Sequence, residues 1–192
     1  MYQSFLEIKR DVERCEKCAL ARTRTHAVFG EGNVRAEIMF VGEGPGAVED
    51  RTGRPFVGPA GILLEKMLNA AGLSRREVYI ANIVKCRPPG NADPAPEYAQ
   101  ACIDYLREQV RFIHPKILVC LGRIAAGYLL GRPVAITKER GTVYKVKNFY
   151  ILPTYHPSAL LRNESLKKEA WADFKKIIAL RDKLREESNG NA

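Results

Sequence analysis

Residues 37–46 read EIMFVGEGPG, a short apolar run that ends abruptly in glycines. Such a run predicts a buried strand over residues 37–42. Similar runs follow at 78–84 (VYIANIV), 116–121 (KILVCL) and 149–152 (FYIL). Helical patterns separate them, at 59–70, 97–112 and 123–130. Strands that alternate with helices predict βαβ units with right-handed crossovers, and therefore an α/β fold with a mostly parallel sheet.

The segments outside these units predict the remaining elements. Residues 3–14 and 165–185 have helical patterns, and residues 143–146 pair with 149–152 as a possible hairpin. The Gly- and Pro-rich stretch from 43 to 59 predicts a long ordered loop. We expect one domain over residues 1–192, with a disordered tail at 186–192.

Composition narrows the class of protein. The 192 residues are 46% hydrophobic and 28% charged, which excludes a disordered or fibrous chain. No apolar run approaches the roughly 20 residues of a membrane span, and the first residues are charged, so we expect no membrane association and a cytoplasmic, intracellular protein. Lys and Arg number 31 against 22 Asp and Glu, a net charge of +9 that favours a polyanionic partner.

The cysteines suggest a metal site. They are Cys15, Cys18, Cys86, Cys102 and Cys120. The odd number argues against a disulfide framework, and the C-x-x-C at 15–18 lets two thiolates face one centre. Two pairs together would suit zinc or an iron–sulfur cluster, and spacing does not choose between them. The alternative is a redox C-x-x-C with two buried thiols. Cys120 lies in an apolar strand and reads as a core residue.

Three polar residues stand where predicted strands end. Glu43 follows the first strand, Asn82 interrupts the end of the second, and His156 follows the last, before a proline. Ligands of parallel sheets bind beyond the carboxyl ends of the strands, so we expect these side chains to converge. The alternatives are a tight turn with an exposed Glu43, and an Asn82 amide bonded to a neighbouring loop.

Three longer motifs carry a resemblance to a known family: GEGPGAVEDRTGRPFVGPAGILL (42–64), NIVKCRPPGNADPAPEYAQAC (82–102) and HPSALLRNE (156–164). The sequence resembles the family 4 uracil-DNA glycosylases, the iron–sulfur members of their superfamily. The resemblance implies a three-layer α/β/α fold around a four-stranded, mostly parallel sheet. It implies DNA repair by hydrolysis of the N-glycosidic bond of uracil in single- or double-stranded DNA, which releases free uracil and leaves an abasic site. It also implies a [4Fe-4S] cluster held by Cys15, Cys18, Cys86 and Cys102.

The resemblance assigns roles at the base pocket. His156 hydrogen-bonds the uracil O2, Asn82 reads the polar edge, and Phe56 stacks on the flipped base. Glu49 lies near the C5 face, where bulk excludes the methyl group of thymine. Gly42 and Gly44 let the backbone approach the base. Gly44 stands where many superfamily members have a water-activating Asp or Asn, so Glu43 becomes the expected catalytic carboxylate.

The expected DNA contacts are Ser158, Leu160, Arg162 and Lys85, and the resemblance assigns the intercalating role to Leu160. Leu160 is the expected wedge in the base stack, although adjacent leucines commonly cap a core. The loop cations Arg51, Arg54, Lys85, Arg87 and Arg162 are expected to bind phosphates. We expect a monomer, with a sliding clamp as a possible partner.

Two other functions stay open. A neighbouring iron–sulfur family traps the abasic sugar covalently through a His in a basic loop, but this chain has RPPGNADPAPE after Cys86, without that His. A non-catalytic, metal-stabilised DNA-binding module would explain the charge and the cysteines. It would not explain a Glu, an Asn and a His at one sheet edge.

Overall fold

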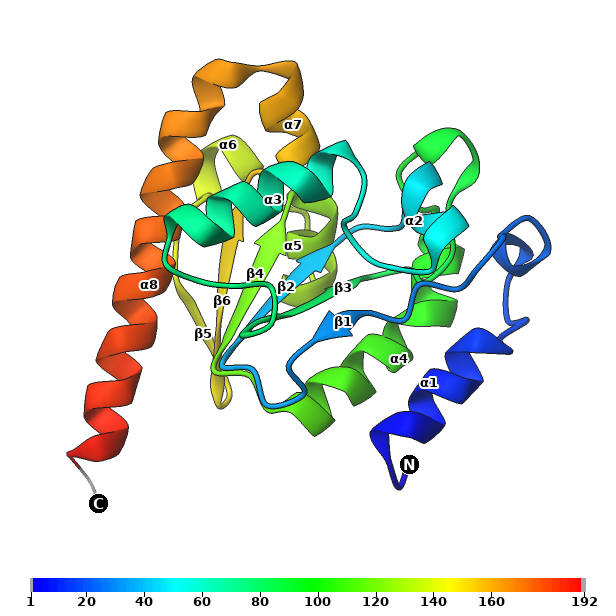
Figure 1. Cartoon of the computed structure of the whole chain (residues 1–192), viewed down its shortest axis with the longest axis horizontal. Coiled ribbons are helices and arrows are strands. Elements are labelled where there is room, and N and C mark those ends of the chain that lie inside the picture. Colours follow the sequence, from blue (N-terminus) through cyan, green and yellow to red (C-terminus); the bar gives the residue numbers. More distant parts are fainter. Residues whose placement is uncertain (1, 191–192) are drawn as a thin grey trace.

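The computed structural model describes residues 2–190 and is built around one six-stranded sheet (Figure 1). The strand order is β1-β3-β2-β4-β6-β5. The bounds are β1 Glu31–Gly32, β2 Ile38–Gly42, β3 Tyr79–Asn82, β4 Ile117–Leu121, β5 Tyr144–Val146 and β6 Phe149–Thr154. The four central strands, β3, β2, β4 and β6, are parallel, and both edge strands pair antiparallel.

The central strands confirm the predicted four-stranded parallel sheet, and the edge strands enlarge it to six. β2 and β4 are buried along their whole length, which explains their continuous apolar runs. β5 forms the suggested hairpin with β6. β1 pairs only two residues with β3, which is too short to show the alternation that identifies a strand in sequence.

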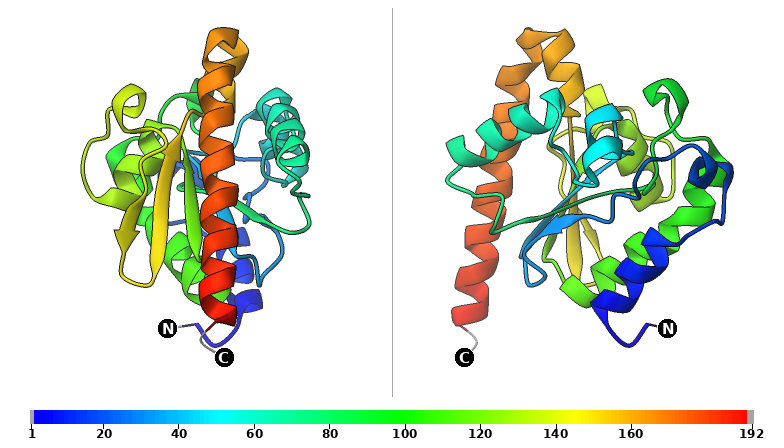
Figure 2. Two further views of the ribbon diagram at one scale, coloured as in Figure 1. Left: turned by 90° about the vertical axis from the view of Figure 1, so that its left-hand side faces the viewer. Right: turned by 45° about the vertical axis from the view of Figure 1, so that its right-hand side comes forward.

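Helices cover both faces of the sheet, as the predicted three layers require (Figure 2). One layer holds α1 Phe5–Glu13, α4 Pro96–Ile113 and α5 Arg123–Leu130, and the other holds α3 Pro59–Ala70 and α8 Lys167–Asn189. Alternate residues of each strand join opposite cores. Met39 and Val41 pack with the α4 layer, and Ile38 and Phe40 pack with α3 and α8.

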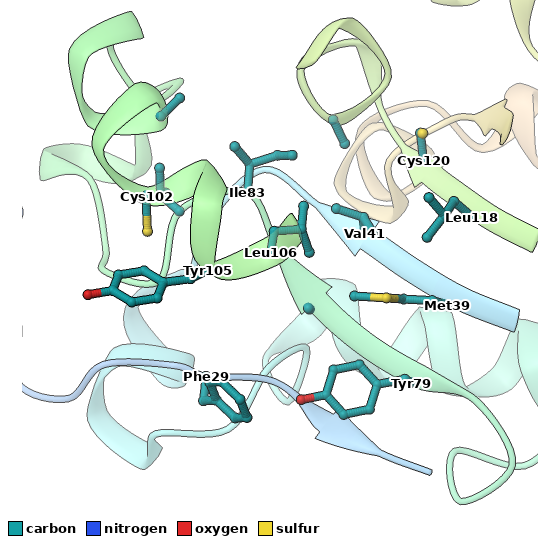
Figure 3. Close-up of a cluster of buried hydrophobic side chains, with 14 of the residues drawn as sticks. Phe29, Met39, Val41, Tyr79, Ile83, Cys102, Tyr105, Leu106, Leu118 and Cys120 are labelled. Carbon is teal, nitrogen blue, oxygen red and sulfur yellow. The ribbon is translucent and has the colours of Figure 1, made fainter. Parts of the chain in front are cut away.

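The core beneath α4 is densely packed (Figure 3). Leu106 of α4 and Met39 of β2 are both fully buried there. Cys120 projects from β4 into this core and is fully buried, as expected of a small apolar residue, whereas Cys102 lies on α4 (Figure 3).

Several predicted loops and termini are helical instead. The stretch 43–59 contains α2 Ala47–Thr52, the segment after His156 forms α7 Pro157–Arg162, and a short α6 spans Ile136–Glu139. Six residues are too few to show helical periodicity, so the sequence pattern missed α2 and α7. The described part of the chain also contains three 3₁₀ turns, at Ala19–Arg22, Pro89–Asn91 and Glu164–Leu166.

The predicted tail is wrong over 186–189, because α8 continues to Asn189, and residues 191–192 of that prediction lie outside the described residues. Within residues 2–190, the structure contains no helix with both the length and the apolar character of a membrane span.

Candidate active site

A cavity of about 670 Å³ opens at the carboxyl ends of the parallel strands. Glu43, Asn82 and His156 all line it, so the predicted convergence of three strand ends is present in the structure. The first residues of α3 and α5 also line it, at Pro59 and Arg123. Helix N-termini carry partial positive charge, so this cavity favours a ligand that becomes negative.

Asn82 supplies an unused hydrogen-bond acceptor. It is the last residue of β3 and 1% exposed. Its Oδ1 is the one buried side-chain polar atom of residues 2–190 without a hydrogen-bond partner. An unsatisfied buried acceptor costs about 1–3 kcal/mol. A ligand that brings a donor to this atom would recover that free energy.

Gly42 allows the aromatic wall of the cavity to reach Asn82. A Cβ on Gly42 would lie 2.5 Å from Oδ1 of Asn82 and 2.6 Å from Cζ of Phe56. Any side chain at this position would therefore displace both residues. The glycine is required by close packing against these two side chains, and its approach to a bound base stays a prediction.

Phe56 is held in a strained conformation. Its φ is 51°, in the left-handed region that non-glycine residues seldom adopt, and its ring centroid lies 5.6 Å from that of His156. Arg75 donates from Nη1 to the Phe56 carbonyl at 2.9 Å. Gly61 of α3 packs against the same carbonyl, where a Cβ would lie at 1.9 Å. The ring is thus fixed in the cavity wall.

Glu49 also braces this wall. Its Oε1 accepts from the main-chain amides of Val57 and Gly58, at 2.9 and 2.8 Å. Glu49 is 9% exposed and borders the cavity. The structure therefore gives Glu49 a bracing role that sequence reasoning missed, beside its place in the pocket wall.

His156 is neutral and has one defined tautomer. Burial, reinforced by the positive charge of Arg162, lowers its pKa to about 4. The main-chain amide of Ser158 donates to Nδ1 at 3.1 Å, and the Ser158 hydroxyl lies 2.8 Å from the same atom. Because Nδ1 is the acceptor, the proton of the neutral ring is on Nε2. His156 can therefore donate one hydrogen bond from Nε2.

Glu43 is a partly buried carboxylate beside this donor. Burial raises its pKa, as does the charge of Asp93, while Arg123 and Arg162 oppose the rise. The described chain gives its carboxylate no hydrogen bond. Gly44, the next residue, packs so closely that a Cβ would lie 2.8 Å from Val84, so no side chain replaces Glu43 from that position without rearrangement.

The structure corrects the predicted wedge. Leu160 is fully buried and packs with Tyr155 and Ala170. Its neighbour Leu161 is 47% exposed and lines the cavity mouth. Arg162 also lines the mouth, at the end of α7. Leu161 is thus the leucine that faces outward.

The predicted loop cations divide into different environments. Lys85 is 1% exposed, so the expectation that it reaches DNA phosphates is wrong for the folded chain. Arg54 forms an ion pair with Glu31 at 2.7 Å. Sequence reasoning missed Arg123, which lines the mouth and pairs with Asp93. Its position directly after the third parallel strand was the available signal.

A second, smaller cavity gathers cysteines. All four predicted ligands border it, which are Cys15, Cys18, Cys86 and Cys102. Cys86 and Cys102 are buried, and Cys15 and Cys18 are partly buried. Burial raises the pKa of Cys102 to about 11, an effect that the nearby Lys85 opposes. The thiols therefore lie together, although no group of three or more His, Cys, Asp or Glu side chains in residues 2–190 is arranged to hold a metal ion.

Two N–H groups donate to the sulfur atoms, one from a guanidinium and one from the main chain. Arg24 donates from Nη1 to Sγ of Cys86 at 3.2 Å. The main-chain amide of Lys85 donates to Sγ of Cys102 at 3.3 Å. N–H donors of this kind favour sulfur that carries negative charge.

Comparisons with known proteins point to one family. The model of the family described as "Uracil DNA glycosylase superfamily" matches residues 29–175. A type-4 uracil-DNA glycosylase of Archaeoglobus fulgidus is 46% identical over 183 residues, 91% of this chain and 92% of that protein. That of Sulfurisphaera tokodaii is 49% identical over 186 residues, with coverages of 92% and 84%. A type-5 uracil-DNA glycosylase of Pyrobaculum aerophilum is 35% identical over 147 residues, 67% of this chain and 64% of that protein.

The fold, the cavity at the strand ends and the family match define the class: the chain belongs to the uracil-DNA glycosylase superfamily. Within it, relatives at 46–49% identity over about nine-tenths of the chain make it a member of the type-4 family. The predicted family is confirmed.

Proposed function

We propose that the protein excises uracil from DNA by hydrolysing its N-glycosidic bond, which leaves an abasic site. One observation carries the proposal. The unpartnered Oδ1 of Asn82 borders the same cavity as the neutral His156 and the fixed Phe56 ring. A flipped uracil has an N–H donor for Asn82, a carbonyl for His156 and a π-face for the Phe56 ring.

Asn82 provides the selectivity for uracil. Its Oδ1 accepts from the N3–H of uracil, and its amide NH₂ is suited to the adjacent O4. Cytosine has an acceptor at N3 and a donor at C4, so both contacts would become unfavourable. Glu49, held by the Val57 and Gly58 amides, forms a rigid wall that excludes the C5 methyl group of thymine.

His156 stabilises the leaving group. The C1′–N1 bond breaks with its electron pair remaining on uracil, and negative charge develops on O2. The Nε2–H of neutral His156 donates to that oxygen, and the N-termini of α3 and α5 add positive potential. Loss of one such donor typically reduces the rate by about 10²–10³.

Glu43 acts on the other side of the broken bond. Its carboxylate stabilises the positive sugar and positions a water molecule, whose oxygen bonds to C1′. That water loses one proton, and the released uracil anion takes up one proton. Its unpaired carboxylate, in the wall of the base cavity, supports this role. Gly44 provides no side chain that could do so.

Leu161 and the mouth cations hold the DNA. We propose Leu161 as the wedge that fills the gap left by the flipped base, since Leu160 belongs to the core. Arg162 and Arg123 are placed to bind phosphates flanking the base, and Ser158 orients His156.

Cys15, Cys18, Cys86 and Cys102 would hold a [4Fe-4S] cluster. The donor set fits, because four thiols border one cavity and two N–H groups point at their sulfurs. Bound there, the cluster would brace α1, the loop after β3 and α4. A sliding-clamp partner, a monomeric state and a cytoplasmic location stay predictions.

The decisive experiment uses uracil-containing single-stranded DNA, incubated with the protein and then heated in alkali. Strand cleavage at the uracil supports the enzyme, and intact DNA across temperature and pH supports the non-catalytic module. A denaturing gel of the same reaction tests the sugar-trapping alternative, since a DNA-linked protein band would contradict hydrolysis. Purified protein that holds the cluster should be brown, with broad absorbance at about 400 nm. Colourless protein with stoichiometric zinc would exclude the cluster.

A further inference from the structure

Lys85 is a buried cation that pairs with no carboxylate of residues 2–190. It is 1% exposed, and its ammonium donates to the Asn82 carbonyl at 2.9 Å and to Oε1 of Gln109 at 2.6 Å. Both acceptors are neutral. Gln109 is itself fixed, because its amide NH₂ donates to Phe29 and Tyr79. A buried charge is costly unless an opposite charge compensates it, so the position of Lys85 needs an anion.

The cysteine site is the source of that anion. Lys85 borders the cysteine cavity, its own amide donates to Cys102, and Cys86 is the next residue. Four thiolates that ligate a cluster leave the site negative. The guanidinium of Arg24 donates to Cys86, so the site also draws a cation directly onto one of its sulfurs.

Lys85 also contacts a residue that lines the base cavity. The carbonyl that accepts from its ammonium belongs to Asn82, whose side chain carries the unpartnered acceptor. One side chain therefore joins the wall of the cysteine cavity to the residue that reads the base.

We propose that Lys85 is a positioning residue that couples the two sites: its ammonium compensates the negative charge of the thiolates and, held there, fixes the end of β3 that carries Asn82. This inference rests on the proposed cluster and the proposed uracil site. It assigns Lys85 no contact with the substrate.

The first test is retention of iron. Lys85→Met removes the charge at similar length, and Lys85→Gln removes it while keeping a hydrogen-bond donor. We expect both variants to lose iron to a chelator roughly 10-fold faster than the wild type, the effect typical of a lost partner around metal ligands. Lys145→Met is the matched control, because Lys145 is an exposed lysine on β5 that borders neither cavity. Iron loss at the wild-type rate in both Lys85 variants would overturn the proposal.

The second test separates charge compensation from ordinary packing. With the cluster in place, Lys85→Met should melt below the wild type. After iron is stripped, the order should reverse, because the variant no longer buries an uncompensated ammonium. A lower melting temperature in both states would mean that Lys85 only packs. If the iron-free proteins show no cooperative melting transition, the rate of iron loss in the first test decides whether the proposal stands.

The third test measures uracil binding and turnover at the base cavity. In Lys85→Met protein that retains full iron, we expect free uracil to bind more weakly and KM to rise more than kcat falls, with Lys145→Met unchanged. Unaltered uracil binding would remove the coupling. Failure of this inference differs from failure of the proposed function: a colourless or inactive wild type contradicts the latter, whereas a brown, active wild type with indistinguishable Lys85 variants contradicts only the coupling.

Discussion

The base cavity and the cysteine site handle polar groups in opposite ways. In the base cavity, Oδ1 of Asn82 has no partner within residues 2–190, and the Glu43 carboxylate is partly buried without a hydrogen bond. In the cysteine site, Arg24 and the Lys85 amide already donate to sulfur. The base cavity therefore has polar groups without hydrogen-bond partners, whereas the sulfurs of the cysteine site already accept hydrogen bonds.

This difference distinguishes a ligand that comes and goes from a group that stays. A substrate site keeps its polar groups free because the substrate must complete them and then leave. A structural site has its supporting shell formed around it. Substitutions in the base cavity should therefore change rates at constant stability, and substitutions at the cysteines should change stability first.

The largest expected effect is that of Glu43→Gln. We expect single-turnover excision of uracil to fall about 10³-fold, within the range for a lost acid–base group, while DNA binding and melting temperature stay near wild type. Glu65→Gln is the control, because Glu65 is an exposed carboxylate on α3. Unchanged excision by Glu43→Gln would remove Glu43 from the mechanism.

The converse prediction concerns Cys15→Ala. Loss of one ligand should release iron and lower the melting temperature by about 10 °C, as a loss of about 3 kcal/mol would. The main loss should be in thermal stability, and the protein that stays folded should lose less of its uracil-excision activity. Cys120→Ala is the control, because Cys120 is buried in the core and is not a proposed ligand. This variant should retain full iron. An unchanged melting temperature with lost activity in Cys15→Ala would contradict the division between the sites.

Sequence patterns predicted the base cavity better than its rim. Glu43, Asn82 and His156 each end an apolar strand, and parallel strands bring their carboxyl ends to one edge whatever the details of packing. The four cysteines could be grouped from their spacing and the family resemblance. These features depend on topology, which apolar runs identify.

The rim depends on tertiary packing that no local pattern contains. The choice between Leu160 and Leu161 follows from how the short helix α7 packs against Tyr155 and Ala170. Lys85 lies beside a proline-rich loop and reads as a surface cation, yet the structure turns it inward toward Gln109 of α4. Side-chain direction at element ends is set by neighbours distant in sequence.

The adjacent leucines offer a matched pair that tests this correction. Leu160→Ala should destabilise the fold by about 2–5 kcal/mol, as expected of a cavity in a core. Leu161→Ala should change stability by less than about 0.5 kcal/mol. It should nevertheless slow excision from duplex DNA roughly 10-fold, with little effect on single strands, because the wedge acts only on a stacked base. Equal rates on duplex DNA for Leu161→Ala and wild type would exclude the wedge.

The smallest expected effect is a displacement of the pH profile by Asp93→Asn. Glu43 must be ionised to act, so excision falls as pH falls through its pKa, which burial and Asp93 hold above the ordinary value of 4.5. Removing Asp93 lowers that pKa and also frees Arg123, whose charge acts in the same direction. The acid limb should therefore move to lower pH. His156 does not produce this limb, because it protonates only near its pKa of about 4.

Single-turnover rates between roughly pH 4 and 8 measure this displacement. Glu97→Gln is the matched control, because it removes an equal charge from an exposed position of the same segment. Equal displacements in the two variants would assign the effect to net charge. No displacement in Asp93→Asn would mean that a group other than Glu43 titrates in the acid limb. A displacement confined to Asp93→Asn would instead place the titrating carboxylate beside Asp93, in the cavity whose hydrogen bonds are left for the substrate.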